Sequence, residues 1–192
     1  GYSEWSPAHY FTSAKLTTTT LPYYDSFSQN KNVGEYNNPL DWNTHYTVDD
    51  VEGQYKYPYV ANDRGEDKVV YLYSDASSET SYMVSPKIDV DNLNKCQISF
   101  NYKPDVSSVK SQRAIVVGVV SDVSSKAKIA STFHPIDTII TTGTLQYSQV
   151  VVSLASYSSS AKYVALMVNH SLNRAKLTDK NTGAVVSGQR VF

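Results

Sequence analysis

Apolar and polar side chains alternate along residues 96–102, so that one side of an extended segment is apolar and the other polar. The apolar positions are Cys96, Ile98, Phe100 and Tyr102, and the polar positions are Gln97, Ser99 and Asn101. A period of two with one polar face is typical of a half-buried antiparallel strand. The preceding residues 81–90 place Val84, Ile88 and Val90 around a turn at Pro86, which predicts a second, interrupted strand.

Several other short segments are rich in β-branched and aromatic residues and predict further strands. They are residues 54–59, 69–73, 114–120, 138–141, 149–154 and 162–168, with shorter apolar fragments around Val185 and Val191. Residues 114–120 are continuously apolar, as in a strand that is buried on both faces. We find no stretch of 10–15 residues with a 3.6-residue period and caps. The pattern therefore predicts an all-β fold, an antiparallel jelly-roll β-sandwich.

The charge and the amino-acid composition of the chain limit the kinds of partner that we expect. The net charge is −1, so we expect neither nucleic acid nor an anionic membrane surface as a partner. No apolar run approaches the roughly 18 residues needed to span a bilayer. Charged residues are 18% of the chain and tyrosine occurs 16 times, a surface that is typical of secreted or cell-surface binding domains. Cys96 is the single cysteine, either a small buried hydrophobe or a reactive thiol.

The order and spacing of several segments resemble one family of β-sandwich modules. These segments are residues 21–27, 81–90, 98–103, 116–122, 132–136, 150–157 and 162–165. Together they resemble the choice-of-anchor J and cleaved-adhesin modules, the gingipain-adhesin type of jelly roll, which is similar to MAM, concanavalin-like and galactose-binding-like domains. The resemblance implies an adhesion module and, near the family's opening strand, a structural calcium ion.

A shorter resemblance concerns the start of the chain. Trp5-Ser6-Pro7 with Phe11-Thr12 is similar to the last strand of a fibronectin type III domain. We therefore expect residues 1–16 to be a remnant strand of a preceding Ig-like or fibronectin-like domain plus linker. Residues 17–192 would then be the jelly-roll domain of a longer, multidomain chain, with neighbouring domains as partners.

No catalytic motif accompanies these strands. Glycosidases of this general shape need two carboxyl groups about 5–5.5 Å or 6.5–9.5 Å apart. Asp50 and Glu52 share a strand parity but lie in loop-like sequence, where a solvated acidic turn explains them. The chain has no Gly-x-Ser-x-Gly elbow and no His-Glu-x-x-His pair, and its four histidines are far apart. We therefore predict that the protein is not an enzyme.

Two regions offer oxygen ligands for calcium, which prefers six to eight of them. Asp25 stands in the segment that resembles the family's opening strand, and its role follows from that resemblance alone. Residues 62–67 place Asp63 and Asp67 in a turn with a glycine. These three aspartates are the predicted metal ligands, and the alternative for the turn is a charged, solvated loop.

Aromatic residues offer a binding platform. Tyr55, Tyr57 and Tyr59 alternate along one side of an extended segment, with Trp42 upstream. Such rings pack against the C–H faces of sugars, although cross-strand packing within the sandwich is the alternative. Pro58 favours an edge strand or loop and hence exposure.

The sequence thus predicts a non-catalytic adhesion or carbohydrate-binding module whose partner is a glycan or an extracellular protein. Two alternatives remain open. One is a structural spacer without a ligand of its own, and the other is an accessory fragment of a glycosidase or peptidase.

Overall fold

The structure of the chain is a computed structural model. The described residues are 18–19, 21–30, 39, 41–46, 58–63, 67–72, 80–103, 114–141, 146–157, 160–169, 176–178 and 185–187. The expected remnant at residues 1–16 lies outside them, as do Tyr55 and Tyr57.

A five-stranded antiparallel sheet forms one layer of the molecule, in the order β2-β5-β11-β8-β9. Its strands are β2 (Asn43–Tyr46), β5 (Thr80–Val84), β11 (Tyr163–Asn169), β8 (Ala114–Val120) and β9 (His134–Ile140). Every residue of β8 is buried, which agrees with its continuously apolar sequence. The expectation that this strand is covered on both faces is confirmed.

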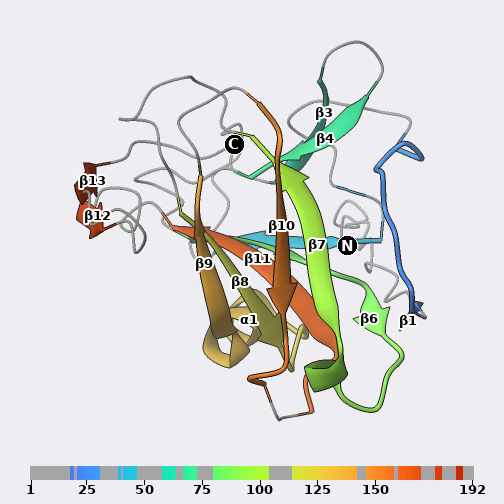
Figure 1. Ribbon diagram of the computed structural model, residues 1–192. Helices are drawn as coiled ribbons and strands as arrows, with labels where there is room; N and C mark the ends of the chain where they lie inside the picture. Colours follow the sequence, from blue (N-terminus) through green and yellow to red (C-terminus); the bar gives the residue numbers. More distant parts are fainter. Residues whose placement is uncertain are drawn as a thin grey trace, which may run out of the picture.

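The second layer is the antiparallel pair β7 (Gln97–Tyr102) and β10 (Ser148–Ser153), which lies in front of the sheet in Figure 1. Ile98 and Phe100 of β7 and Val150 of β10 pack against buried Met83, Val117 and their neighbours between the layers. Gln97, Ser99 and Asn101 are exposed. The alternation predicted for residues 96–102 is therefore present, and the fold class, an all-β antiparallel sandwich, is confirmed.

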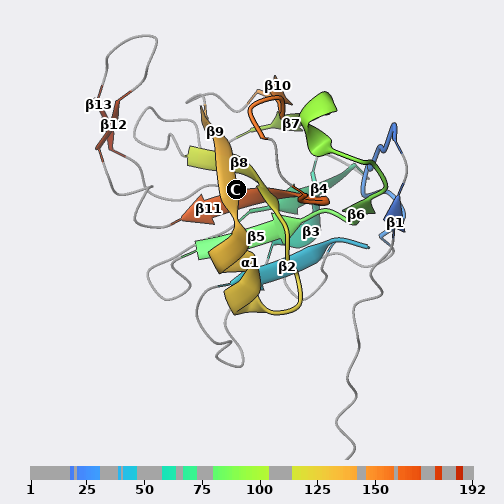
Figure 2. The ribbon, with the colours of Figure 1, turned by 90° about the horizontal axis from the view of Figure 1, so that it is seen from below.

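The other side of the five-stranded sheet is covered by a short helix, α1 (Lys126–Thr132), as Figure 2 shows. Ile129 is fully buried in a cluster with Tyr82 and Val120. The side chain of Ser125 caps the helix by accepting a hydrogen bond from the backbone N–H of Lys128. The sequence analysis did not predict this helix, because seven residues span only about two turns and show no clear helical period.

Strand β9 begins earlier than predicted. It starts at His134 and continues through Pro135, whereas the sequence predicted a strand only over residues 138–141. The register with β8 shifts at Val117/Gly118, where the bulge accommodates the proline. A Cβ atom at Gly118 would lie 2.5 Å from the carbonyl oxygen of His134, so the close approach of the two strands requires glycine there.

Smaller paired elements complete the fold. They are the hairpin β3 (Tyr59–Asn62) with β4 (Lys68–Tyr71), the parallel pair β1 (Thr18–Thr19) with β6 (Lys87–Ile88), the antiparallel pair β12 (Lys176–Thr178) with β13 (Val185–Ser187), and the 3₁₀ turn Leu93–Lys95. Among the described residues, no helix has the length and apolar character that crossing a membrane demands.

Candidate functional site

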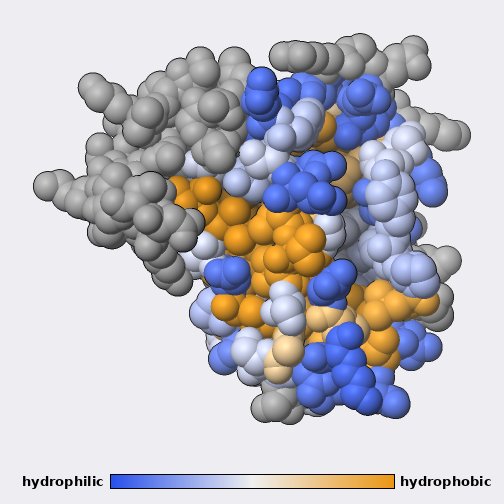
Figure 3. Space-filling model, in the orientation of Figure 1, coloured by the Kyte–Doolittle hydropathy of each residue, from blue (hydrophilic) through white to orange (hydrophobic). Residues whose placement is uncertain are grey.

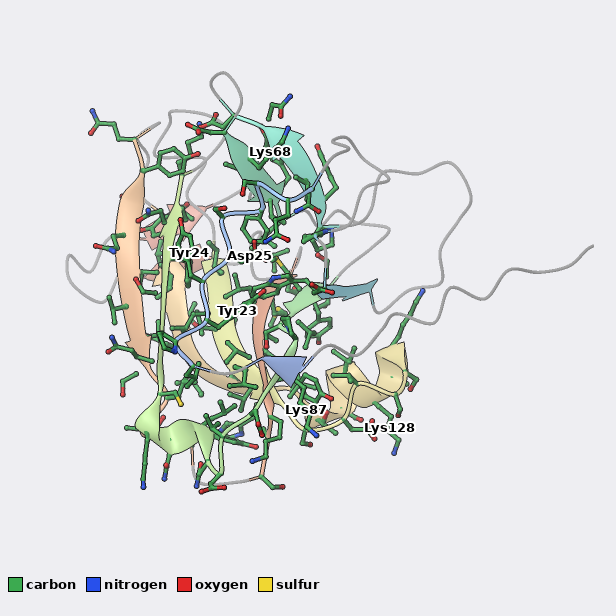
Figure 4. The ribbon with its side chains drawn as sticks, turned by 90° about the vertical axis from the view of Figure 1, so that its right-hand side faces the viewer. Tyr23, Tyr24, Asp25, Lys68, Lys87 and Lys128 are labelled. Carbon is green, nitrogen blue, oxygen red and sulfur yellow. The ribbon has the colours of Figure 1, made fainter. Side chains whose placement is uncertain are left out.

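Asp25 lies at the centre of a cluster that closes one side of the sandwich, and we call Tyr23, Asp25, Phe27 and Trp42 the Asp25 cluster. Its Oδ1 accepts a hydrogen bond from the backbone N–H of Phe27 at 2.6 Å. Its Oδ2 accepts one from Trp42 Nε1 at 2.9 Å and one from the Tyr23 hydroxyl at 3.1 Å. Figure 4 shows Tyr23, Tyr24 and Asp25 on the segment that runs across the side of the two layers.

The aromatic rings of this cluster are part of the packing of the sandwich. The Trp42 ring centroid is 6.1 Å from that of Phe27 and 6.5 Å from that of Tyr23. Trp42 and Phe27 are half-buried and pack against the core between the layers. Burial, followed by the charge of Asp25, raises the pKa of Tyr23 to about 12. The hydroxyl of Tyr23 therefore stays protonated as a donor at neutral pH.

Two of the three predicted calcium ligands, Asp25 and Asp63, already accept hydrogen bonds from protein donors. Three donors point at the Asp25 carboxylate, and Asp63 forms an ion pair with Lys103. The carbonyl oxygen of Asp67 accepts the backbone N–H of Asp63 at 2.8 Å and so ties the ends of the turn together. The described residues contain no group of three or more His, Cys, Asp or Glu placed to hold a metal ion. Because the carboxylate oxygens of Asp25 and Asp63 already accept hydrogen bonds from protein groups, calcium at these positions stays a prediction, which a chelation test addresses.

A second cluster forms where three chain segments meet, and we call Asp63, Lys103 and Tyr147 the Asp63 cluster. Asp63 Oδ1 pairs with the Lys103 ammonium group, and Oδ2 accepts a hydrogen bond from the Tyr147 hydroxyl at 2.6 Å. Lys103 Nζ also lies 4.9 Å from the centroid of the Tyr147 ring, within the range of a cation–π contact. Burial and the hydrogen bond to Asp63 raise the pKa of the Tyr147 hydroxyl, which keeps it a donor.

The two clusters differ in exposure. Tyr147 is 50% exposed, although Asp63 and Lys103 beside it retain only 14% and 21% of their side-chain exposure. Two partners thus fix the tyrosine ring while half of the residue remains open to solvent. In the Asp25 cluster, by contrast, Tyr23, Phe27 and Trp42 are all half-buried.

Tyr59 belongs to neither cluster. It stands opposite Tyr71 in the β3–β4 hairpin, and the two rings stack with centroids 5.3 Å apart. Both residues are half-buried. This cross-strand pair explains the tyrosine at position 59 by packing within the hairpin, and its predicted role in ligand binding stays a prediction.

Tyr147 and Lys103 stand at one end of the outward side of the second layer. The register pairs Asn101 with Gln149, Ser99 with Val151, and Gln97 with Ser153, and one further step places Lys103 opposite Tyr147. Because side chains alternate between the faces of a strand, these eight positions point to the same side. We call them the outer face. Its first three pairs contain no charged side chain, and Val151 is 55% exposed. Figure 3 looks onto this side and shows apolar surface in the region of β10 and towards β9, with hydrophilic residues around it.

Sequence reasoning did not select Lys103 or Tyr147. A signal was available, since Tyr147 has the parity of the exposed positions of β10 and Lys103 has that of the exposed positions of β7. The predicted strand began only at residue 149, which left Tyr147 in the preceding loop. Nothing local indicated that Asp63, 84 positions earlier, would meet it.

Together the fold and these clusters define a β-sandwich with a largely uncharged outer face. No family model matches the chain, and no curated protein matches it. Among solved structures, the K2 cleaved adhesin domain of Lys-gingipain is similar, with 15% sequence identity and a TM-score of 0.50. The similarity covers 77% of this chain and 89% of that domain. At this identity the likeness establishes a shared fold.

Proposed function

We propose that this chain is a non-catalytic binding module of the adhesion type, a part of a secreted or cell-surface multidomain protein. Its ligand is a glycan or an extracellular protein. One observation carries the proposal: the second layer presents a continuous, exposed outer face that ends in the half-exposed ring of Tyr147. A strand pair with an aromatic side chain held in place at its rim is suited to recognition without rearrangement.

The hydrogen bonds that the carboxylates of Asp25 and Asp63 already accept support a non-catalytic role. Hydrolysis by a pair of carboxyl groups needs one that can give up a proton and one that can accept it or attack the substrate. The oxygens of Asp25 and Asp63 are occupied by protein donors. Both residues therefore serve to fix neighbouring aromatic side chains.

The similar solved structure adds support for adhesion, because it carries the name of an adhesin domain. The low charge content and the abundance of hydroxyl and amide side chains are consistent with an extracellular setting.

The test is a binding screen of the folded chain. We expect saturable binding to at least one member of an array of oligosaccharides or of a panel of immobilised extracellular matrix proteins, measured by biolayer interferometry. The same panel is run with the heat-unfolded chain as a control for non-specific adsorption. Absence of binding to both classes would support the structural-spacer alternative. Turnover of any oligosaccharide or peptide would contradict the non-catalytic assignment.

A further inference from the structure

We infer that the outer face of β7 and β10 is the ligand-binding surface, that its ligand is an uncharged glycan, and that Tyr147 is the residue on which a sugar ring stacks. This inference rests on the proposed function, since it presumes a binding module. It adds the place, the chemical class of the ligand and the residue that anchors it.

The dimensions of the face suit a chain-like ligand. Four cross-strand pairs follow one another from Gln97 and Ser153 at one end to Lys103 and Tyr147 at the other. Six residue steps along a strand correspond to about 20 Å. The face is thus a track longer than one sugar ring, with its aromatic residue at one end.

The side chains of the track match the chemistry of sugar hydroxyl groups. Serine hydroxyls and the amides of asparagine and glutamine each donate and accept hydrogen bonds, as sugar hydroxyls do. They are Gln97, Ser99, Asn101, Gln149 and Ser153, all exposed. Val151 stands between them and gives the C–H face of a sugar ring an apolar contact.

Tyr147 is prepared for stacking. Its hydroxyl donates to Asp63, and its ring lies beside the Lys103 ammonium group, so the side chain is ordered before the ligand arrives. A ligand that stacks on an ordered ring loses less conformational entropy than one that must order it. Aromatic residues with a polar tip combine this apolar contact area with a fixed orientation.

The charges favour a neutral ligand over an acidic one. Lys103 is the cation of the outer face, and it is already paired with Asp63. A sulfated or uronic-acid glycan would have to compete with Asp63 for this ammonium group and would bring a negative charge close to the carboxylate. The other three cross-strand pairs hold no charge that could compensate.

The same face is less suited to a protein partner. A stable protein interface buries about 800 Å² on each side around a core enriched in aromatic, Met and Arg side chains. Of the eight outer-face side chains, Val151 and Tyr147 are the two with an apolar or aromatic body. Five of the remaining positions are small or amide side chains, which bind hydroxyl groups well but form a poor interface core.

The experiment uses neutral hexasaccharides of glucose, mannose, galactose and xylose, together with hyaluronan and heparin fragments as acidic probes. The neutral oligosaccharide with the highest affinity is then titrated against variants by calorimetry. We expect Tyr147→Ala to weaken binding by at least about tenfold, whereas Tyr147→Phe, which keeps the ring but loses the hydroxyl bond to Asp63, weakens it less. Binding should change little between low and high salt, because no charge is recognised.

A matched pair of arginine variants locates the surface. Val151→Arg places a long cation in the middle of the outer face and should abolish binding. Ala127→Arg places the same side chain at an exposed position of α1. In Figure 4 the label Lys128 marks this helix, which lies on the other side of the five-stranded sheet from β7 and β10. This control should bind as the parent does. Thermal melts confirm that all variants are folded.

The outcomes separate this inference from the proposed function. Glycan binding that is indifferent to Tyr147→Ala and Val151→Arg overturns the surface but leaves a binding module. Binding restricted to acidic glycans, or to extracellular proteins, overturns the ligand class and again leaves the module. If the folded chain binds neither these glycans nor the panel of immobilised extracellular matrix proteins, the inference and the proposed function both fail.

Discussion

The Asp25 cluster and the Asp63 cluster are built from similar parts and serve different ends. In each, an aspartate accepts a hydrogen bond from a tyrosine hydroxyl and from a second side-chain donor. In the Asp25 cluster that donor is the Trp42 indole, and in the Asp63 cluster it is the Lys103 ammonium group. The first faces the core, and the second stands at the rim of an exposed face.

This difference teaches that burial, rather than the type of residue, decides what an aromatic–carboxylate cluster does. Trp42 is one of the four aromatic residues that the sequence favoured for ligand binding, yet its N–H donates to Asp25 and its ring lies near those of Tyr23 and Phe27. Tyr147, which the sequence did not favour, keeps half of its surface free. The Asp25 cluster should therefore carry stability, and the Asp63 cluster recognition.

The largest expected effect is that of Trp42→Ala. The variant loses a half-buried indole that packs against the core and leaves Asp25 without one of its donors. We expect the free energy of unfolding to fall by about 3 kcal/mol, measured by urea denaturation. Trp42→Phe keeps a ring in place and should cost less. A Trp42→Ala variant of unchanged stability that lost glycan binding would reverse the roles of the two clusters.

The next effect is that of Asp25→Ala, which leaves the Tyr23 hydroxyl, Trp42 Nε1 and the Phe27 N–H without their acceptor. We expect a loss of about 2 kcal/mol in the free energy of unfolding, and a smaller loss for Asp25→Asn, which retains one acceptor oxygen.

A chelator sharpens the interpretation of Asp25. Because protein donors occupy its carboxylate, we expect the melting temperature of the parent chain to be the same with EDTA and with added calcium. A melting temperature that falls with EDTA in the parent but not in Asp25→Ala would restore the predicted calcium ion at this position.

A pH dependence should come from Tyr23. Its folded-state pKa is about 12, against about 10 in an unfolded chain. The folded state holds the phenol proton more tightly, so this contribution is fully present below pH 10 and is lost as pH rises from 10 towards 12. We expect Tyr23→Phe, which cannot ionise, to lose stability less steeply over this range in urea denaturation. Parallel curves for parent and variant would show that the Asp25 cluster does not hold the proton.

The smallest effect on stability is expected at the rim. A double-mutant cycle with Asp63→Ala and Lys103→Ala should give a coupling free energy of about 0.2–1 kcal/mol, since the pair is partly exposed. Tyr147→Ala should likewise leave the melting temperature close to that of the parent. A coupling free energy as large as the loss of unfolding free energy in Asp25→Ala would show that the Asp63 cluster stabilises the packing of the β3–β4 hairpin against the second layer.

Part of the fold could be predicted because strand faces are encoded locally. The two-residue period at 96–102 predicted which side chains of β7 point inward, and the apolar run at 114–120 predicted a fully covered strand. The helix α1 was not predicted because it is too short to show a helical period. The start of β9 was misplaced because a bulge at Val117/Gly118 lets a proline lie within the strand.

The candidate site was predicted less well. Asp63 was selected for its oxygens and assigned to calcium, and Tyr59 was selected for its ring. The residues that they contact in the folded chain could not be predicted from the sequence. Asp63 meets Lys103 and Tyr147 across separations of 40 and 84 positions, and no local pattern links residues so far apart.

What the sequence determined by itself is the set of strands and the side of each strand that faces the core, because alternation follows from the geometry of an extended backbone. The tertiary structure decided which exposed residues become neighbours. The register of β7 against β10 brought Lys103 opposite Tyr147, and the β3–β4 hairpin brought Asp63 to them. Register and layer packing depend on the whole core at once, so the outer face becomes visible only when the chain is folded.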